Sequence, residues 1–326
     1  MTYEVLLGDC IESMKKLPAE SVDMCVTSPP YYSLRDYGND KQIGLEATLG
    51  GYIDNMVKVF EEVRRILKPE GTLWLNLGDS YNGSGGAGGD YNKGGLKEGQ
   101  PKYPGKNEPT LKRKDLMGVP WRVAFALQEA GWWLRQDIIW AKPNCMPEPV
   151  KDRCTRSHEY IFMLTKQEKY YYDNQAIKEP VGAAMLRYVE KGPEYVPALK
   201  DNPATRSDSK EHPNRMFNSE QSLENMKQGR NKRSVWTISP KPYKGAHFAV
   251  YPPELIEPCI LAGCPHGGTV LDPFGGSGTT AGVAVKHGRN AILCELNEEY
   301  AAIIPSRVES ITQIPKEVLN DKREWI

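Results

Sequence analysis

The sequence lacks any apolar run that approaches the roughly 20 residues of a membrane-spanning helix. Its first residues, Met1 to Glu4, also lack the basic start and the apolar stretch of a secretory signal. Seven cysteines are scattered along the chain without a C-x-x-C pair, which is typical of reduced thiols and argues against a disulfide framework. We therefore expect a cytoplasmic protein that makes no use of a membrane.

The sequence also contains little that could bind a metal ion. Cys259, Cys264 and His266 lie close together, but no second pair of ligands follows them, so we expect no metal site. The formal net charge is zero, with 42 basic and 42 acidic residues. This balance argues against a uniformly basic nucleic-acid-binding surface, although a local basic face would be compatible with it.

Helical and strand periodicities alternate along the 326 residues, a length sufficient for one large domain or two with a substantial core. Apolar residues at helical spacing predict a long helix over 52–67, which Lys68-Pro69-Glu70-Gly71 should end before a strand over 72–77. Further strands are predicted over 3–7, 22–27, 134–140, 159–164, 269–271 and 290–294, and further helices over 10–17, 119–130, 277–286 and 298–307. Such alternation is typical of an α/β fold.

Two segments interrupt this alternation. Residues 82–107 are rich in glycine and show no periodicity. A mobile loop that covers a site is therefore a better interpretation than a passive linker. From 177 to 234 apolar residues become scarce and basic residues accumulate, among them Arg230, Lys232 and Arg233. This second stretch is typical either of a solvated excursion or of a segment that contacts phosphates.

One motif follows the predicted strand over 22–27 and consists of Ser28-Pro29-Pro30-Tyr31, followed by Tyr32. Neither proline can donate a backbone hydrogen bond, so the pair should end the strand in a stiff turn. The turn presents a hydroxyl, two rigid carbonyls and two aromatic rings at the carboxyl end of a strand, where open α/β sheets bind ligands. Taken alone, it is equally typical of a surface turn.

A second motif joins a predicted strand to a predicted helix, and it consists of Asp272, Pro273, Phe274, Gly275, Gly276, Ser277, Gly278, Thr279 and Thr280. Its glycines permit a tight turn and the close approach of a ligand, while the first helical turn offers unpaired N–H groups. Glu295 ends the next strand, where a carboxylate can accept hydrogen bonds from both hydroxyls of a ribose. The arrangement indicates a nucleoside-binding βαβ unit.

The same loop matches the dinucleotide-binding pattern G-x-G-x-x-A from Gly276 to Ala281, so a nicotinamide dehydrogenase is a rival interpretation. Two observations count against it. The loop lies too near the C-terminus for a second mononucleotide half to follow. Asp272 would also repel a bound pyrophosphate, whereas a cationic ligand without phosphates would suit a carboxylate there.

In this order, the two motifs resemble the paired signatures of the β group of amino-group DNA methyltransferases, which use S-adenosylmethionine. The resemblance covers residues 3–175 and 235–310. It implies a Rossmann-like α/β fold whose seven-stranded, mostly parallel sheet contains one antiparallel strand and has helices on both faces. It also implies a catalytic half over 1–176, a small inserted target-recognition segment over 177–234 and a cofactor-binding half over 235–326.

The resemblance assigns residues to three sites. The catalytic residues would be Ser28, Pro29, Pro30 and Tyr31. The cofactor would contact Asp9, Cys10, Phe248, Asp272, Pro273, Phe274, Gly275, Gly276, Ser277, Gly278, Thr279, Thr280 and Glu295. DNA would contact Arg153, Arg156, His158, Arg230, Lys232 and Arg233, whereas Trp140-Ala141-Lys142-Pro143 is a structural mark of the family.

The reaction implied is methyl transfer to an exocyclic amino group of a base that has left double-stranded DNA. Ser28 and the carbonyl of Pro29 would accept hydrogen bonds from that amino group. Tyr31 would stack on the base or form a wall of the cofactor pocket. Serine at the first motif position is commoner among family members that act on N4 of cytosine, so we expect N4-cytosine, with N6-adenine as the alternative.

Three other hypotheses, which differ in the reaction, in the substrate or in whether the protein is an enzyme, are less favoured. Transfer to carbon 5 of cytosine would need a cysteine nucleophile, but Cys259 lies in an apolar helical run and is expected in the core. A catalytically silent DNA-binding protein and a methyltransferase acting on RNA are the second and third. The resemblance suggests a bacterial, archaeal or phage-encoded protein, active as a monomer or homodimer, for which a cognate restriction endonuclease is conceivable. No role is assigned to Tyr32.

Overall fold

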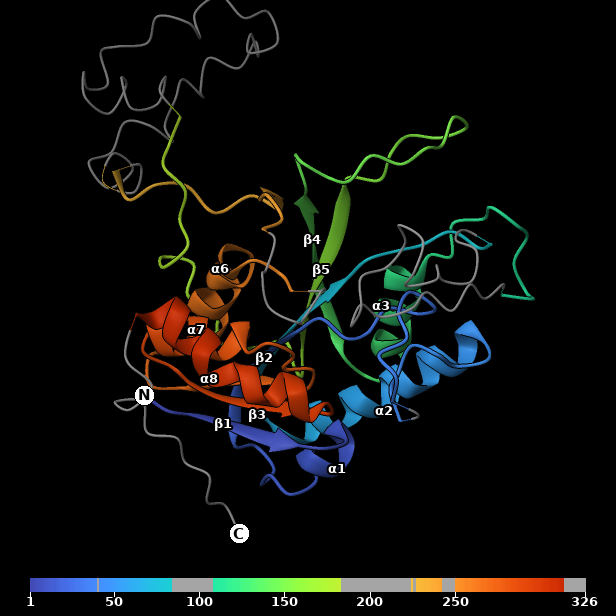
Figure 1. Cartoon of the computed structure of the whole chain (residues 1–326). Coiled ribbons are helices and arrows are strands. Elements are labelled where there is room, and N and C mark those ends of the chain that lie inside the picture. Colours follow the sequence, from blue (N-terminus) through green and yellow to red (C-terminus); the bar gives the residue numbers. More distant parts are fainter. Residues whose placement is uncertain (40, 84–107, 183–223, 225–226, 242–249, 314–326) are drawn as a thin grey trace, which may run out of the picture. The chain divides into compact units, whose positions relative to one another are not determined.

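The computed structural model describes residues 1–39, 41–83, 108–182, 224, 227–241 and 250–313 (Figure 1). The chain divides into two compact units, one formed by Met1–Tyr172 with Ser234–Ile326 and the other by Asp173–Arg233. Most of the glycine-rich segment 82–107, most of the expected target-recognition segment and Phe248 lie outside the described residues. The helices that are described include none with the length and apolar character needed to cross a membrane.

An eight-stranded sheet organises the larger unit, with the strand order β1-β8-β7-β2-β3-β5-β4-β6. The strands are β1 (Tyr3–Leu7), β2 (Val22–Thr27), β3 (Leu67–Leu77), β4 (Trp133–Ala141), β5 (His158–Thr165), β6 (Val235–Thr237), β7 (Thr269–Asp272) and β8 (Asn290–Glu295). β5 runs antiparallel to β3 and β4, and the other neighbouring pairs are parallel. The expected mostly parallel sheet with one antiparallel strand is confirmed, and the short β6 adds an eighth strand to the seven expected.

Helices cover both faces of this sheet (Figure 1). They are α1 (Cys10–Met14), α2 (Leu49–Ile66), α3 (Val119–Glu129), α6 (Pro253–Gly263), α7 (Thr279–Lys286) and α8 (Glu298–Thr312). α1, α2 and α3 pack together on one face, and α6, α7 and α8 pack together on the other. α2 begins where the Thr48 side chain accepts a hydrogen bond from Gly51 N, which satisfies one of the unpaired donors of its first turn.

The turn expected at 68–71 is instead part of β3. The strand already starts at Leu67, which pairs with Val22, whereas the next partner along β2, Met24, pairs with Thr72. The intervening residues therefore form an irregularity in the ladder, and Lys68 Nζ lies 2.7 Å from Asp23 Oδ1 across it. The helix stops at Ile66 as the motif predicted, but the chain passes directly into the sheet because Leu67 and Thr72 both pair with β2.

The two sequence motifs meet where β2 and β7 lie side by side in the sheet. From β2 the chain proceeds to β3 on one side, and from β7 it proceeds to β8 on the other, so the strand order reverses between them. Open α/β sheets bind ligands outside the carboxyl ends of the strands at such a switch point. Thr27 ends β2 and Asp272 ends β7, and the Thr27 hydroxyl donates a 2.6 Å hydrogen bond to Asp272 Oδ1.

The start of α7 depends on a left-handed residue that packs tightly against α8. Gly278 has a φ of 87°, and a Cβ placed there would lie 2.7 Å from Cγ2 of Ile304. We expect Gly278→Ala to lower the free energy of unfolding by at least ~1–2 kcal/mol, because an L-residue is strained in that conformation. Urea unfolding followed by circular dichroism would measure the loss.

The matched control is Gly50→Ala, because Gly50 lies in the first turn of α2 and its Cβ would have Thr48 Oγ1 as nearest neighbour at 3.9 Å. Alanine is the better helix former, so this variant should be unchanged or more stable by up to ~1 kcal/mol. Equal stabilities of the two variants would contradict the role given to Gly278.

Candidate active site

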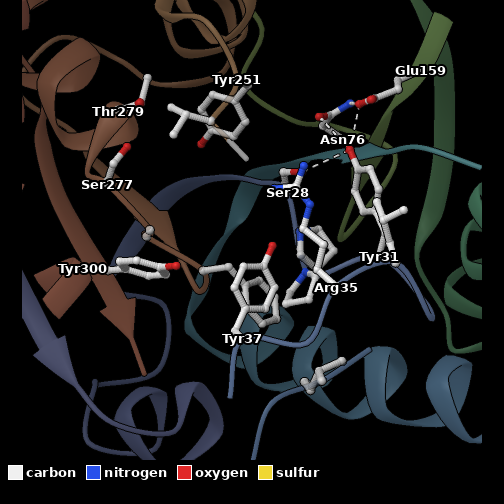
Figure 2. A pocket seen from close by; sticks show the side chains of 18 of the residues that line it. Ser28, Tyr31, Arg35, Tyr37, Asn76, Glu159, Tyr251, Ser277, Thr279 and Tyr300 are labelled. Carbon is white, nitrogen blue, oxygen red and sulfur yellow. Dashed lines mark hydrogen bonds between the residues drawn. The ribbon is translucent and has the colours of Figure 1, made fainter. Parts of the chain in front are cut away.

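A cavity of about 770 Å³ lies at the switch point and is lined by both motifs (Figure 2). Its walls come from the carboxyl ends of β1, β2, β7 and β8, from Asn76 of β3 and from residues of β4 and β5. Figure 2 shows Ser28, Tyr31, Asn76 and Glu159 on one side and Ser277, Thr279 and Tyr300 on the other. The cavity therefore has two regions, which we call the turn side and the glycine-loop side.

The turn side contains all four predicted catalytic residues, Ser28, Pro29, Pro30 and Tyr31. The turn is fixed from behind by Tyr52 of α2, whose hydroxyl donates a 2.9 Å hydrogen bond to the carbonyl of Pro30. Because that carbonyl is already occupied, the neighbouring carbonyl of Pro29 is the better candidate for a ligand contact. Proline at both positions limits the backbone rearrangement that could move it.

Tyr32, for which the sequence suggested no role, points into the core and not into the cavity. Its side chain is 2% exposed, and its ring lies 5.6 Å from that of Tyr52. Its hydroxyl donates to Glu108 Oε2, which also accepts a hydrogen bond from Leu49 N at the start of α2. Tyr32 therefore ties the turn to the start of a helix.

Tyr31 connects the turn to the antiparallel strand β5. Its hydroxyl donates a 2.7 Å hydrogen bond to Glu159 Oε2, and the Ser28 hydroxyl points at the Tyr31 oxygen from 3.3 Å. Burial raises the pKa of Tyr31 well above its usual range, and the nearby Glu159 adds to the shift, so the phenol is neutral. The Tyr31 ring packs closely against the backbone of Gly78, where a Cβ would lie 2.7 Å from Cε2 of Tyr31.

On the glycine-loop side, six of the predicted cofactor residues line the cavity: Pro273, Phe274, Gly275, Gly276, Ser277 and Thr279. Asp272, Gly278 and Thr280 lie behind this wall and are not among the lining residues. Asp272 is 1% exposed and accepts hydrogen bonds from Thr27, Thr280, Tyr251 and Phe274 N. Burial raises the pKa of Asp272, and the four donors oppose that shift. Its role here is to position the loop.

Glu295, at the end of β8, is one of the acidic residues that line the cavity. Its Oε2 accepts a hydrogen bond from Gly276 N at 2.7 Å, and its Oε1 accepts one from Asn297 N at 2.9 Å. Burial raises the pKa of Glu295 to about 7. A carboxyl group with this pKa changes its charge close to neutral pH, so ligand binding there should depend on pH.

Asp9 and Cys10, which were predicted to contact the cofactor, also line the cavity. They occupy the start of α1, where Asp9 Oδ1 accepts a hydrogen bond from Glu12 N. Burial raises the pKa of the Cys10 thiol to about 12, so it is a neutral, largely apolar wall group. The remaining predicted cofactor residue, Phe248, lies outside the described residues, but Tyr251 of the same motif lines the wall.

Sequence reasoning missed several lining residues, notably Arg35, Tyr37, Lys142, Glu159 and Tyr300. Arg35 and Tyr37 lie in a polar stretch without periodicity, where no signal distinguishes a site residue from a surface residue. Lys142 stood in a motif that was interpreted as structural. Lys142 Nζ forms an ion pair with Glu159 Oε1, and it also lies 4.1 Å from the centre of the Trp140 ring.

The basic residues predicted to contact DNA in the larger unit occupy different environments. Arg156 and His158 line the cavity, and Nη1 of Arg156 is buried without a hydrogen-bond partner in the described part of the chain. Arg153 instead pairs with Glu148 and lies 3.8 Å above the ring of Tyr81. Contact with DNA stays a prediction for all three.

In the smaller unit, the three predicted basic residues surround one carboxylate. Oε2 of Glu179 lies 3.3 Å from Nη2 of Arg230 and 3.1 Å from Nε of Arg233. Its Oε1 lies 3.9 Å from Nζ of Lys232. The Arg233 side chain is nevertheless 68% exposed. The Glu179 side chain is only 19% exposed, and contact of these basic residues with DNA stays a prediction.

Cys259, the cysteine weighed as a nucleophile from the sequence, lies in the core and away from the cavity. Cys259 is fully buried in α6, and its thiol points at the carbonyl of Leu255 inside the same helix. It is not among the lining residues. No group of three or more His, Cys, Asp or Glu side chains suited to a metal ion occurs among the described residues.

Comparison with known proteins identifies relatives over nearly the whole chain. A model of the N6 and N4 DNA methylase family matches residues 22–306. The type II methyltransferase M.SmaI of Serratia marcescens is 46% identical over 308 residues, covering 94% of this chain and 90% of that protein. The type II methyltransferase M.Cfr9I of Citrobacter freundii is 43% identical, covering 93% and 86%.

Solved structures share the fold at lower identity. The PvuII DNA methyltransferase, described as cytosine-N4-specific, has a TM-score of 0.61 at 20% identity and covers 99% of this chain and 94% of its own. A DNA modification methylase of Thermus thermophilus, solved with S-adenosyl-L-methionine, has a TM-score of 0.57 at 21% identity and covers 96% of each chain.

The hydrogen bond between Thr27 and Asp272 should contribute measurably to stability. Thr27→Val keeps the shape of the side chain but removes one of the four donors to a buried carboxylate. We expect it to lower the free energy of unfolding by ~1–3 kcal/mol, the usual cost of leaving a buried polar group short of a partner. Thr27→Ser retains the hydroxyl and should recover most of that loss in chemical denaturation. A valine variant as stable as the wild type would contradict the role given to this bond.

Proposed function

Because this chain belongs to the N6 and N4 DNA methylase family, whose members include DNA methyltransferases, we propose that it is a type II enzyme that methylates N4 of cytosine in double-stranded DNA. The observation that carries this proposal is the meeting of the two motifs in one cavity, with Ser28 on one side and the glycine loop on the other. N6-adenine is the alternative substrate.

The cofactor of this proposal is S-adenosylmethionine, which supplies a methyl group on a positively charged sulfur. The residues present suit it. The cavity volume of about 770 Å³ is in the range of cofactor sites. Glu295 offers a carboxylate to ribose hydroxyls, and its hydrogen bonds from Gly276 N and Asn297 N fix its orientation. Cys10 and Phe274 add apolar walls beside it.

On the turn side, Ser28 Oγ and the carbonyl of Pro29 would accept hydrogen bonds from the amino group of the target base. An exocyclic amine is a weak nucleophile because its lone pair is delocalised into the ring. Two acceptors outside the ring plane favour a tetrahedral nitrogen, whose lone pair is free for attack. The Tyr52 hydroxyl on Pro30 fixes the turn before reaction, so little reorganisation is needed.

The target base must leave the duplex to reach Ser28, because the cavity lies at the carboxyl ends of buried strands. Tyr31 lines the cavity and is oriented by its hydrogen bond to Glu159, so its ring could stack on that base. Arg156 and His158 lie in the same cavity and are proposed to face DNA. Arg230, Lys232 and Arg233 are proposed to contact phosphates.

Serine at position 28 supports cytosine over adenine as the substrate. A neutral hydroxyl draws off less charge than the carboxylate of an aspartate would, which is adequate for the smaller pyrimidine. Tyr31 and the partly buried ion pair of Lys142 and Glu159 also line the cavity on this side.

Tritiated S-adenosylmethionine and mixed-sequence duplex DNA test the proposal directly. Digestion of the labelled DNA to nucleosides should yield N4-methyldeoxycytidine, whereas N6-methyldeoxyadenosine would establish adenine as the substrate. Ser28→Ala should reduce transfer by roughly 10²-fold, since removal of one preorganised polar group has that order of effect. It should leave S-adenosylmethionine binding unchanged, because Ser28 belongs to the turn side.

Three other results would contradict the proposal. Absence of label from wild-type reactions would favour a catalytically silent DNA-binding protein. Label in RNA alone would identify a different substrate. Loss of cofactor binding in Ser28→Ala would indicate that Ser28 contacts the cofactor and not the base. Long-read sequencing of DNA from a host that expresses the protein would then give the recognition sequence.

The raised pKa of Glu295 predicts that cofactor affinity depends on pH. The ionised carboxylate is the better acceptor for ribose hydroxyls, so the dissociation constant for S-adenosylmethionine should fall as pH rises from 6 to 8 through the pKa of about 7. In the protein without ligand, ionisation of Glu295 has the opposite effect, because it lowers the stability of the fold. Glu295 favours folding most strongly below its ordinary pKa of 4.5, and this contribution is lost as pH rises through about 7.

Calorimetric titrations between pH 6 and pH 8 measure this effect. Glu295→Gln keeps an acceptor oxygen but cannot ionise, so its affinity should be about tenfold lower at pH 8 and should no longer vary with pH. A wild-type dissociation constant that stays constant across this range would rule out Glu295 as the titrating contact.

A further inference from the structure

A continuous chain of hydroxyl groups leads from the cavity to a carboxylate (Figure 2). The Ser28 hydroxyl donates toward Tyr31 Oη at 3.3 Å, and the Tyr31 hydroxyl donates to Glu159 Oε2 at 2.7 Å. The Tyr31 oxygen also lies 3.3 Å from Asn76 Oδ1, but its contact with Glu159 is the shorter of the two. Ser28 Oγ therefore presents lone pairs to the cavity, and Glu159 is the final acceptor.

Besides Tyr31, two residues hold Glu159 in place, Lys142 and Asn76. Lys142 Nζ pairs with its Oε1 and balances its charge. The amide of Asn76 donates to Glu159 Oε2 at 3.3 Å and to the carbonyl of Tyr160 at 3.0 Å. The Glu159 side chain is only 15% exposed, so it does not turn freely into solvent.

The contact between Tyr31 and Glu159 depends on the absence of a side chain at Gly78. Gly78 follows β3, and a Cβ there would lie 2.7 Å from Cε2 of Tyr31 and 3.2 Å from Cδ of Glu159. Any larger residue would push the tyrosine and the carboxylate out of their present positions. The absence of a side chain at Gly78 thus serves the contact between Tyr31 and Glu159.

Methyl transfer to an amine creates a proton that must leave, and the Ser28 hydroxyl is the start of a hydrogen-bonded chain that ends on the carboxylate of Glu159. We propose that Ser28, Tyr31 and Glu159 form a proton relay in which Glu159 takes up the proton that the methylated amino group loses. This inference rests on the proposed function, because it requires the amino group to lie against Ser28 Oγ.

The step balances in atoms and charge. The bond between sulfur and the methyl carbon breaks with its electron pair remaining on sulfur, and the nitrogen lone pair forms the new carbon–nitrogen bond. The cationic nitrogen then gives its proton to Ser28 Oγ, while the Ser28 proton moves to Tyr31 and the Tyr31 proton moves to Glu159 Oε2. Both hydroxyls keep one proton each, Glu159 becomes a carboxylic acid, and no further reactant is needed.

The electrostatics of the cavity suit this direction of transfer. Burial raises the pKa of Tyr31, so its hydroxyl stays protonated and able to donate. Glu159 contacts Lys142 and Tyr31, and Arg156 and His158 line the same cavity. The nitrogen cation that forms next to Ser28 thus loses its proton to the carboxylate of Glu159. That carboxylate is paired with Lys142.

The test uses two adjacent tyrosines, because only one of them belongs to the relay. Tyr31→Phe removes the middle hydroxyl but keeps the ring, and Glu159→Gln keeps the size of the final acceptor but cannot take up a proton. Tyr32→Phe is the matched control, since its hydroxyl contacts Glu108 on the opposite side of the turn. All three are compared with the wild type in single-turnover methyl transfer in H2O and in D2O.

We expect Tyr31→Phe and Glu159→Gln to slow the single-turnover rate by roughly 10²-fold, the usual contribution of a positioned proton acceptor. Binding of S-adenosylmethionine and of DNA should be unchanged. The wild type and Tyr32→Phe should react more slowly in D2O, and this isotope effect should be altered in both relay variants. Wild-type rates in Tyr31→Phe and Glu159→Gln would overturn the relay, as would loss of rate explained entirely by weaker binding.

A second measurement needs neither cofactor nor DNA. Carbon-13 labelling of tyrosine Cζ allows the ionisation of Tyr31 to be followed by NMR, with Tyr31→Phe identifying its resonance. In Glu159→Gln the pKa of Tyr31 should fall, because a negative neighbour has been removed. An unchanged titration would overturn the contact on which the relay depends. Failure of the wild type to methylate DNA would overturn the proposed function together with the relay, whereas failure of the relay variants alone to differ from it would overturn only the relay.

Discussion

The hydrogen bond from Thr27 to Asp272 joins two residues that lie 245 positions apart in the sequence. It connects the end of β2 to the end of β7, and each of these strands leads into one of the two motifs. A carboxylate that is 1% exposed is costly unless it is well supplied with donors. Asp272 satisfies this requirement with Thr27, Thr280, Tyr251 and Phe274 N, and in doing so it aligns both sides of the cavity.

This arrangement changes the electrostatic argument that the sequence suggested. Asp272 was expected to face a cationic ligand, but it is surrounded by its own donors behind the cavity wall. The acidic group on the glycine-loop side is Glu295, whereas the turn side contains Lys142 and Arg156 next to Glu159. Acidic and basic groups therefore both line the turn side, where Lys142 pairs with Glu159.

Much of the fold and half of the site could be predicted from the sequence, because those features depend on local pattern. Two prolines after an apolar run and a glycine turn between a strand and a helix are compatible with few structures. The contact between Tyr31 and Glu159 could not be predicted in this way. It joins residues 128 positions apart and exists only because β5 inserts antiparallel between β3 and β4, an order that no local periodicity encodes. The edge strand β6 escaped detection for a related reason, since three residues are too few to show a period.

The adjacent tyrosines Tyr31 and Tyr32 show how a short turn can serve both the core and the site. The Leu34 N–H donates to the carbonyl of Tyr31, so the chain turns directly after Tyr31 and the two adjacent rings leave it in different directions. Tyr31 consequently enters the cavity and reaches Glu159, while Tyr32 enters the core and reaches Glu108 at the start of α2. Each hydroxyl ends on a carboxylate from a different part of the chain, so the turn is fixed from both sides. On the cavity side, the turn is held by the contact of Tyr31 with Glu159 and by the Tyr52 hydroxyl on Pro30.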